Sequence, residues 1–209
     1  MSYTDFTNEQ ISSLGYLVSY RLSQKRYIHT LGTVKAAEKL GALIIPKELN
    51  LLRAASLLHD IAKELTSDQA EKLALENDLF DHSLWKSPAT RHALLGAYLI
   101  VRDFPGFADP RILSAVMNHT TGSPDMSLFD EIIFIADYIE DGRTYQSCIE
   151  VRERLYSELL STEDINERIR ALHRAVVASI DYTIEALAKA GREVSEISLL
   201  TKKAISALI

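Results

Sequence analysis

The amino-acid sequence predicts an all-α protein folded as a single helical bundle. Only 8 of its 209 residues are glycine and 5 are proline, so the residues that most often interrupt helices are scarce. Apolar residues recur at three- and four-residue intervals along most of the chain, which is the period of an amphipathic helix. Runs of β-branched residues are few, so a sheet is not expected.

The composition is that of an ordinary globular chain. Hydrophobic residues make up 47% and charged residues 25% of the sequence, and the length suits one domain. The net charge is -6 and no basic run follows one stretch of chain, which argues against a nucleic-acid polymer as partner. A small phosphorylated molecule is still compatible, because a local cationic site can bind phosphate on an acidic protein.

No segment directs the chain to a membrane or to an oxidising compartment. No stretch approaches eighteen uncharged apolar residues, and the first ten residues lack the basic and apolar regions of a signal peptide. The only cysteine, Cys148, cannot form an internal disulfide. We therefore expect a cytoplasmic protein with no membrane partner.

The first long helix is expected over about Leu22–Leu40, with Gly41 as its stop signal. Helical spacing places Arg26 and His29 on one stripe of this helix. Residues 1–21 lie ahead of it as an N-terminal extension that we expect to be helical.

The next helix is expected over about Glu48–Leu65, and Thr66 opens a further short one. Ser87 is a candidate cap followed by proline, which predicts a helix over about Ala89–Val101 with His92 near its start.

Two further caps bound the middle of the chain. Asp109, again followed by proline, begins a helix that ends near His119. Ser127 lies three residues before Asp130 in a capping-box pattern and starts a helix through Glu140. The remaining helices are expected at about 146–160, at 164–190 and from 196 onward.

Three polar residues, His59, Asp60 and Lys63, interrupt the apolar segment LLRAASLLHDIAKEL. Adjacent helical side chains diverge by about 100°, so His59 and Asp60 can clasp one point, with Lys63 one turn beyond. A buried His or Asp without a partner costs about 1–3 kcal/mol. A metal ion or a salt bridge within the helix would compensate that cost.

Taken alone, the His-Asp pair is more often a hydrogen-bonded core pair with a solvated lysine. Other polar residues in apolar helices favour a metal site: His29, His119, and Asp137, the only charged residue between Glu131 and Glu140. A satisfied core histidine is the alternative for each histidine, and a buried cap or ion pair for Asp137. The candidate ligands follow the order His29, His59-Asp60, His92, His119, Asp137.

That order resembles the HD-domain superfamily, metal phosphohydrolases defined by a His, a later His-Asp pair and a distant Asp. The closer resemblance is to the YqeK-type branch, symmetrical bis(5'-nucleosyl)-tetraphosphatases, and runs from about Leu22 to about Ala204. That branch tends to have proline in place of Asp141, so the acidic residue alters the loop there. The resemblance is carried by KRYIHTLGTVKAA, AASLLHDIAKEL, the HA of RHALLGA, ILSAVMNHTTGSPDMS and IIFIADYIEDGR, and extends through the closing GREVSEISLLTKKAI.

The resemblance implies an HD metal-binding core over residues 22–145, with residues 146–209 as helices packing on it in the same domain. It also implies two divalent or mixed-valence ions, the second bound through the other oxygen of Asp60. A carboxylate can bridge two ions because it carries two oxygens. Four imidazoles and two carboxylates suit iron, manganese or zinc better than calcium, and the resemblance points to iron. The first ion would be held by His29, His59, Asp60 and Asp137, and the second by Asp60, His92 and His119.

Two ions about 3.5–4 Å apart lower the pKa of a bridging water and bind the attacked phosphoryl group, so no nucleophilic side chain is needed. Asp60 and Lys63 are therefore the expected catalytic residues, with Lys63 supplying a point charge to a phosphate. Arg143 is a candidate for a second phosphate, or else a salt-bridge partner or a helix C-terminal charge. Arg26 would bind phosphate, or hold Asp137 or Asp141.

The turn after His119 completes the expected substrate site, because Thr120 and the backbone through Gly122 would offer hydrogen-bond donors. His82 and His173 are expected to lie outside the ligand set, in solvated or core-edge positions.

The function that the resemblance implies is hydrolysis of diadenosine tetraphosphate, a nucleotide substrate, into two ADP. The first alternative is an HD-type phosphohydrolase acting on a nucleoside phosphate or a cyclic nucleotide, because the metal core specifies the phosphate chemistry and does not recognise the nucleobase. The second is a nucleotide-binding module without turnover. The apolar stripe of the last helices is bundle core, or alternatively the face of a homodimer.

Overall fold

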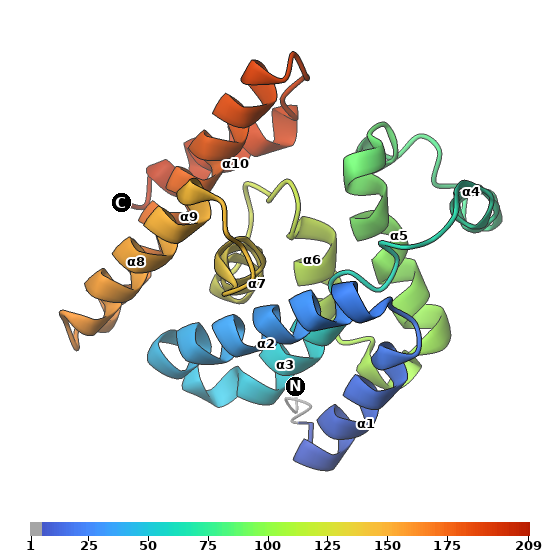
Figure 1. Cartoon of the computed structure of the whole chain (residues 1–209), viewed down its shortest axis with the longest axis horizontal. Coiled ribbons are helices and arrows are strands. Elements are labelled where there is room, and N and C mark those ends of the chain that lie inside the picture. The colour runs from blue at the N-terminus through green and yellow to red at the C-terminus, as the bar shows by residue number, and fades with distance from the viewer. Residues whose placement is uncertain (1–5) are drawn as a thin grey trace.

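The structure, a computed structural model, describes residues 6–209, so part of the expected N-terminal extension, residues 1–5, lies outside the described residues. The described chain is all-α, as predicted, with ten α-helices, three short 3-10 helices and no strand (Figure 1). The α-helices are α1 Asn8–Ser19, α2 Gln24–Ile44, α3 Leu49–Leu58, α4 Ser67–Glu76, α5 Pro88–Asp103, α6 Pro110–Asn118, α7 Leu128–Ile139, α8 Gln146–Leu160, α9 Ile165–Lys189 and α10 Glu196–Ser206. The 3-10 helices are η1 Pro46–Glu48, η2 Ser83–Trp85 and η3 Pro105–Phe107.

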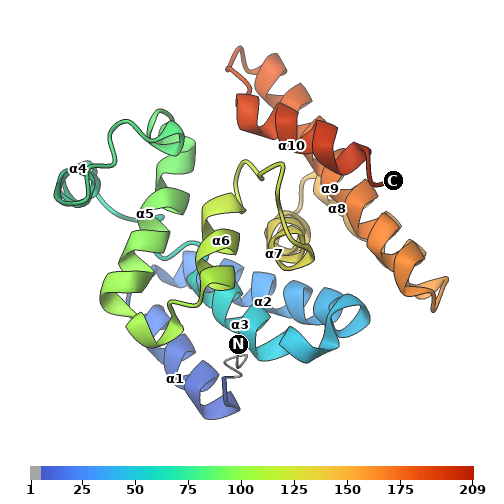
Figure 2. The same cartoon turned by 180° about the vertical axis from the view of Figure 1, so that it is seen from behind.

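Four helices, α2, α3, α6 and α7, pack against one another at the centre of the bundle. Both views show α7 between α6 and a layer formed by α8, α9 and α10 (Figure 1 and Figure 2). Helix α5 packs against α6 on the opposite side, α1 packs against α3, and α4 lies at the periphery beside α5. Fully buried side chains of the central helices include Leu40, Leu52, Leu58, Ile112, Ile132 and Ile133.

The caps that bound the functional helices lie where the sequence predicts them. Asp109 caps α6 through the backbone N–H of Arg111, and His119 is the C-terminal cap of that helix. Ser127 and Asp130 form a capping box at the start of α7. These caps set the bounds of α6 and α7 and so fix the positions of His119 and Asp137 along the two helices.

The helix prediction around Gly41 was wrong, because α2 continues past this residue to Ile44. A Cβ on Gly41 would collide with the Leu52 side chain and approach Leu49 within 3.1 Å. Gly41 therefore permits the close contact between α2 and α3 instead of ending α2.

The predicted helix over about Glu48–Leu65 was also too long, because α3 ends at Leu58 and His59 is its C-terminal cap. Beyond it the backbone tightens into turns closed by i→i+3 hydrogen bonds, from Ile61 to Leu58 (3.1 Å) and from Lys63 to Asp60 (2.9 Å). The His-Asp pair thus lies at a helix end and in a tight turn. None of the described helices has both the length and the apolar character needed to cross a bilayer.

Candidate metal centre

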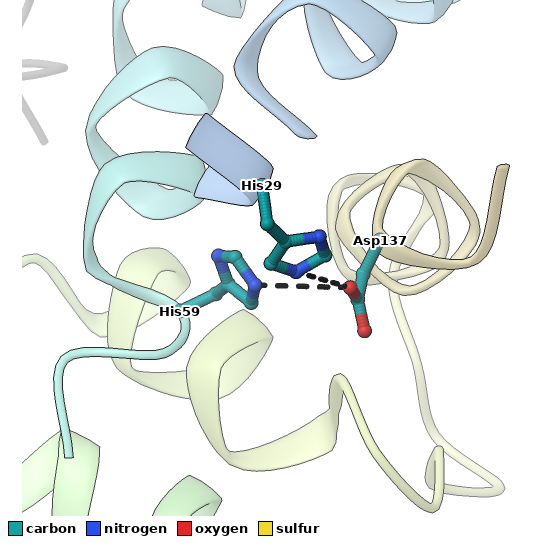
Figure 3. Close-up of side chains that lie close together, drawn as sticks. All are labelled: His29, His59 and Asp137. Atoms are coloured by element: carbon teal, nitrogen blue, oxygen red, sulfur yellow. Dashed lines mark ion pairs between the residues drawn. The ribbon is translucent and has the colours of Figure 1, made fainter. Parts of the chain in front are cut away.

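His29, His59 and Asp137 converge from three helices that are distant in sequence. His29 lies on α2, His59 caps α3 and Asp137 lies on α7 (Figure 3). Both Nε2 atoms point at the same oxygen, Asp137 Oδ1, at 3.0 Å from His29 and 3.8 Å from His59. We call this group the first cluster.

A second cluster consists of Asp60, His92 and His119, all buried. The Nε2 atoms of His92 and His119 are 3.0 Å apart, and they lie 3.2 Å and 3.6 Å from Asp60 Oδ1. His92 lies in the second turn of α5, whereas His119 ends α6. Two helices and the turn after α3 therefore supply these groups.

Asp60 connects the two clusters because its oxygens face opposite ways. Oδ1 faces His92 and His119, whereas Oδ2 lies 3.7 Å from His29 Nε2 and 3.5 Å from His59 Nε2. Each cluster alone brings three ligand-type atoms within 4.8 Å of one another. One carboxylate can therefore serve two neighbouring ions.

Hydrogen bonds on the far side of two rings leave ligand lone pairs in the centre. The Nδ1 atom of His59 is 2.7 Å from Ser56 O, and that of His119 is 2.7 Å from Val116 O. A carbonyl oxygen only accepts, so each Nδ1 carries the proton and each Nε2 of the neutral ring has a free lone pair.

The ligand nitrogens of the first cluster make no hydrogen bond of good geometry within the protein. The Nε2 atoms of His29 and His59 are buried, and Asp137 Oδ1 lies near both without completing such a bond. Such atoms are costly unless something compensates them. Imidazole nitrogens and carboxylate oxygens arranged in this way fit a transition-metal ion or zinc.

The ionisation states of the second cluster also suit metal binding. Burial raises the pKa of Asp60, but His59, His119 and His92 outweigh it and hold that pKa well below its usual range. Burial, with the charges of His119 and Lys63, lowers the pKa of His92 to about 4, although Asp60 opposes this shift. Asp60 is therefore a carboxylate and His92 a neutral ring at pH 7.

In the first cluster, the pKa values of Asp137 and His59 are likewise lowered, which favours a carboxylate and a neutral ring. Burial opposes ionisation of Asp137, but His29, Arg143 and His59 lower its pKa. Burial lowers the pKa of His59 despite Asp60 and Asp137. His29 differs, because Asp137 and Glu140 overcome its burial and raise its pKa.

Three cations border the clusters. Arg26 donates to Asp60 Oδ2 at 2.8 Å, rather than holding Asp137 or Asp141. Arg143 donates to Asp137 Oδ1 at 2.7 Å, and Lys63 Nζ lies 3.0 Å from His92 Nε2. The two arginine side chains are 29% and 35% exposed, so they form a basic, solvent-accessible edge of the centre.

The turn after His119 is held against the C-terminal helix. The backbone N–H of Gly122 donates to Asn118 O at 2.8 Å, and a Cβ on Gly122 would collide with Thr201 of α10. The hydroxyl of Thr120 is buried and without a hydrogen-bond partner. This hydroxyl is therefore a free polar group of the turn, while the Gly122 N–H is engaged.

The two remaining histidines lie outside both clusters. His82 caps η2 by accepting from the Leu84 backbone N–H. His173 is buried on α9 and pairs with Glu131 at 2.8 Å.

Glu140 is a residue of the centre that sequence reasoning did not single out. Its Oε1 lies 3.1 Å from His29 Nδ1, on the side of the ring opposite the first cluster. The available signal was its position three residues after Asp137 at the end of a strongly apolar helix. The partner is 111 positions away in sequence, so only the fold reveals the contact.

Comparisons with known proteins show the family to which the chain belongs. A family model described as HD domain matches residues 26–142, which include all six ligand candidates. The chain is 32% identical over 188 residues to "Bis(5'-nucleosyl)-tetraphosphatase, symmetrical" of Bacillus subtilis (strain 168), covering 88% of this chain and 91% of that protein. A protein of the same name from Halalkalibacterium halodurans is 31% identical over 185 residues, with the same coverage.

The fold also has a solved counterpart. A crystal structure from Clostridium acetobutylicum, described as a predicted HD superfamily hydrolase involved in NAD metabolism, matches with a TM-score of 0.77 and 26% identity. The match covers 97% of this chain and 98% of that one. The helices outside residues 26–142 therefore belong to the shared architecture as well.

Proposed function

This chain belongs to the HD-domain family, and we propose that it is a metal-dependent hydrolase that splits diadenosine tetraphosphate symmetrically into two ADP. The observation that carries the proposal is Asp60, whose two oxygens face two separate clusters of ligand-type side chains. The identity of the substrate is supported by two relatives named for this activity, each matched over 91% of its length.

The donor set indicates what each cluster would hold. We propose that one ion is bound by His29, His59, Asp137 and Asp60, and the other by Asp60, His92 and His119. When bound, such a pair of ions supplies an activated water and electrophilic stabilisation of the phosphoryl group. Iron is our proposed metal, with manganese and zinc compatible with the same donors.

The basic edge is suited to a polyphosphate. Lys63 lies beside the second cluster, and Arg26 and Arg143 lie beside the two carboxylates. Their charges would hold the phosphate chain and stabilise the negative charge that develops during attack. Guanidinium groups can bind phosphate through two parallel hydrogen bonds, whereas lysine acts as a point charge.

The reaction is a hydrolysis at the middle of the phosphate chain. Water forms one P–O bond to a central phosphorus, and the oxygen that bridges the two central phosphorus atoms leaves with the other ADP. One P–O bond forms and one P–O bond breaks, and the attacking water gives up a proton, so no oxidant or reductant is needed. The alternative nucleotide substrates differ in the bond cleaved and therefore in their products.

Product analysis tests the assignment. Anaerobically metal-loaded protein is incubated with diadenosine tetraphosphate, and the nucleotides are separated and quantified. We expect two ADP per substrate, with lower kcat/KM on cyclic nucleotides and nucleoside phosphates. Formation of ATP plus AMP, or binding without turnover, would overturn the proposal.

The C-terminal helices leave apolar side chains in solvent, including Leu199 and Leu200 of α10 and Leu160 at the end of α8. Such side chains are compatible with the homodimer expected from the sequence. The homodimer and the cytoplasmic location stay predictions, and sedimentation analysis of the full chain measures the former.

A further inference from the structure

Glu140 is a buried carboxylate to which the proposed reaction gives no role. It caps the C-terminal end of α7 and is only 4% exposed. Its Oε1 lies 3.1 Å from His29 Nδ1, and its Oε2 accepts the backbone N–H of Gly142 at 2.6 Å. Both oxygens therefore act as acceptors at fixed positions.

Two glycines make room for this carboxylate. A Cβ on Gly32, one turn after His29 on α2, would collide with Glu140 Oε2 and lie 3.1 Å from its Cδ. A Cβ on Gly142 would lie 2.9 Å from both carboxylate oxygens. The turn that contains Gly142 is itself held by Arg152, which donates to the backbone oxygens of Glu140 and Arg143.

His29 differs from the other three candidate ligand histidines in this contact. His59 and His119 direct Nδ1 to neutral backbone carbonyls, and Lys63 Nζ lies beside the His92 ring, 3.3 Å from Nδ1 and 3.0 Å from Nε2. Only His29 among the four has a carboxylate behind its ring. A carboxylate on the far nitrogen fixes which nitrogen faces the ion and makes that nitrogen a stronger donor.

We propose that Glu140 is a positioning residue that holds His29 with Nδ1–H directed at its carboxylate and the Nε2 lone pair directed at an ion in the first cluster. This inference rests on the metal centre of the proposed function. Its effect is confined to the first cluster, because Glu140 contacts His29 and no ligand of the second cluster.

Glutamine cannot replace Glu140 in this position. If its amide oxygen faced Gly142, its NH2 group would face His29 and require the opposite tautomer, with the proton on Nε2. If the oxygen faced His29, the NH2 group would meet the Gly142 N–H donor to donor. The substitution Glu140→Gln removes one charge and preserves size, so it tests hydrogen bonding and charge without opening a cavity.

The experiment measures Mn²⁺ binding to the full chain by the electron paramagnetic resonance signal of free Mn²⁺. We expect two sites in the wild type. In Glu140→Gln one site should bind 10–100-fold more weakly, about the loss typical for removed partners of ligand histidines, and the other should be unchanged. The matched control is Glu131→Gln, which alters another buried carboxylate of α7 that pairs with a histidine, His173, outside both clusters.

A second variant leaves every charged group in place. Gly32→Ala inserts a methyl group that collides with Glu140 Oε2 and lies 3.1 Å from its Cδ, so the whole carboxylate must shift and Oε1 leaves its position behind His29. We expect the same loss at a single site. Its control is Gly15→Ala on α1, where an added Cβ meets nothing closer than 3.7 Å, and this variant should bind as the wild type does.

The outcomes separate this inference from the proposed function. Two Mn²⁺ sites of unchanged affinity in both Glu140→Gln and Gly32→Ala would overturn the role of Glu140 and leave the hydrolase proposal standing. A wild type with one site contradicts the dinuclear centre, yet weakening of that site in both variants still supports the positioning role. If Glu140→Gln does not fold, Gly32→Ala decides.

Discussion

At the residue scale, the centre depends on the turn that carries His59 and Asp60. Because α3 ends at Leu58, the two residues lie at a helix end, where they face groups from α2, α5, α6 and α7. Asp60 is the residue that reaches both clusters, through one oxygen each. A side chain with a single ligand atom could not do this.

Lys63 gives a prediction at this scale. Lys63→Ala should lower kcat/KM for diadenosine tetraphosphate by about 10–100-fold, because a hydrogen bond to a charged group contributes about 1.5–3 kcal/mol. Elemental analysis should find the wild-type metal content, since Lys63 contacts His92 but is not a ligand. A fall in metal content with unchanged turnover per bound metal would contradict the assigned contact with phosphate.

At the element scale, local signals in the sequence set the helix starts, while packing sets several ends. The caps Asp109 and Ser127 could be predicted because a cap bonds within its own first turn. The end of α2 could not, because Gly41 is held in the helix by the close approach of Leu52. The end of α3 at Leu58 could not be predicted either, because the segment around His59 carries no glycine or proline as a local stop signal.

Gly122 tests the contact between α10 and the turn after His119. It has φ of 70° and abuts Thr201, whereas Gly191 has φ of 63° and open space where a Cβ would lie. Gly191→Ala should cost about 1–2 kcal/mol of unfolding free energy from backbone strain. Gly122→Ala should cost about 1–3 kcal/mol more, because the methyl group overpacks the interface. If urea unfolding gave the same loss of unfolding free energy for Gly122→Ala and Gly191→Ala, Thr201 would not restrain this turn.

The contact of Glu64 with Ser23, the N-terminal cap of α2, should make part of the stability of the fold depend on pH. Its carboxylate accepts the backbone N–H and the hydroxyl of Ser23, both at 2.6 Å, and these bonds lower the pKa of Glu64. A lowered pKa stabilises the fold above the unfolded-state value and loses this effect as pH falls through the folded value. The Tm difference between wild type and Glu64→Gln should therefore be positive at pH 7 and shrink on acidification through pH 4. A difference that grows on acidification would contradict this sign.

At the scale of the whole molecule, the family could be predicted from the sequence, whereas the contacts within the candidate site could not. The sequence order of His29, His59, Asp60 and Asp137 indicated the HD domain before any geometry. The pairing of Arg26 with Asp60 and the support of His29 by Glu140 could not be predicted. The two contacts join residues 34 and 111 positions apart in sequence, so they depend on how α2 packs in the fold.

The whole-molecule prediction concerns removal of the metal. Stripping the ions with a chelator should lower Tm by about 5–10 °C, because ligand at 100 times its Kd stabilises a protein by about 2.7 kcal/mol. The helical circular dichroism signal should persist below that Tm, since Arg26 and Arg143 already pair with the carboxylates of Asp60 and Asp137. Loss of helix at 25 °C would show that the ions are required for folding.

The most direct test of the shared carboxylate is the rate of ADP formation from diadenosine tetraphosphate by Asp60→Asn, measured anaerobically with saturating metal. Asparagine keeps one ligand oxygen and replaces the other with a group that cannot bind a cation. We predict that this rate falls at least about 1000-fold, the scale of losing a principal electrostatic group, while the variant stays folded. ADP formation at the wild-type rate would contradict the dinuclear centre built around Asp60.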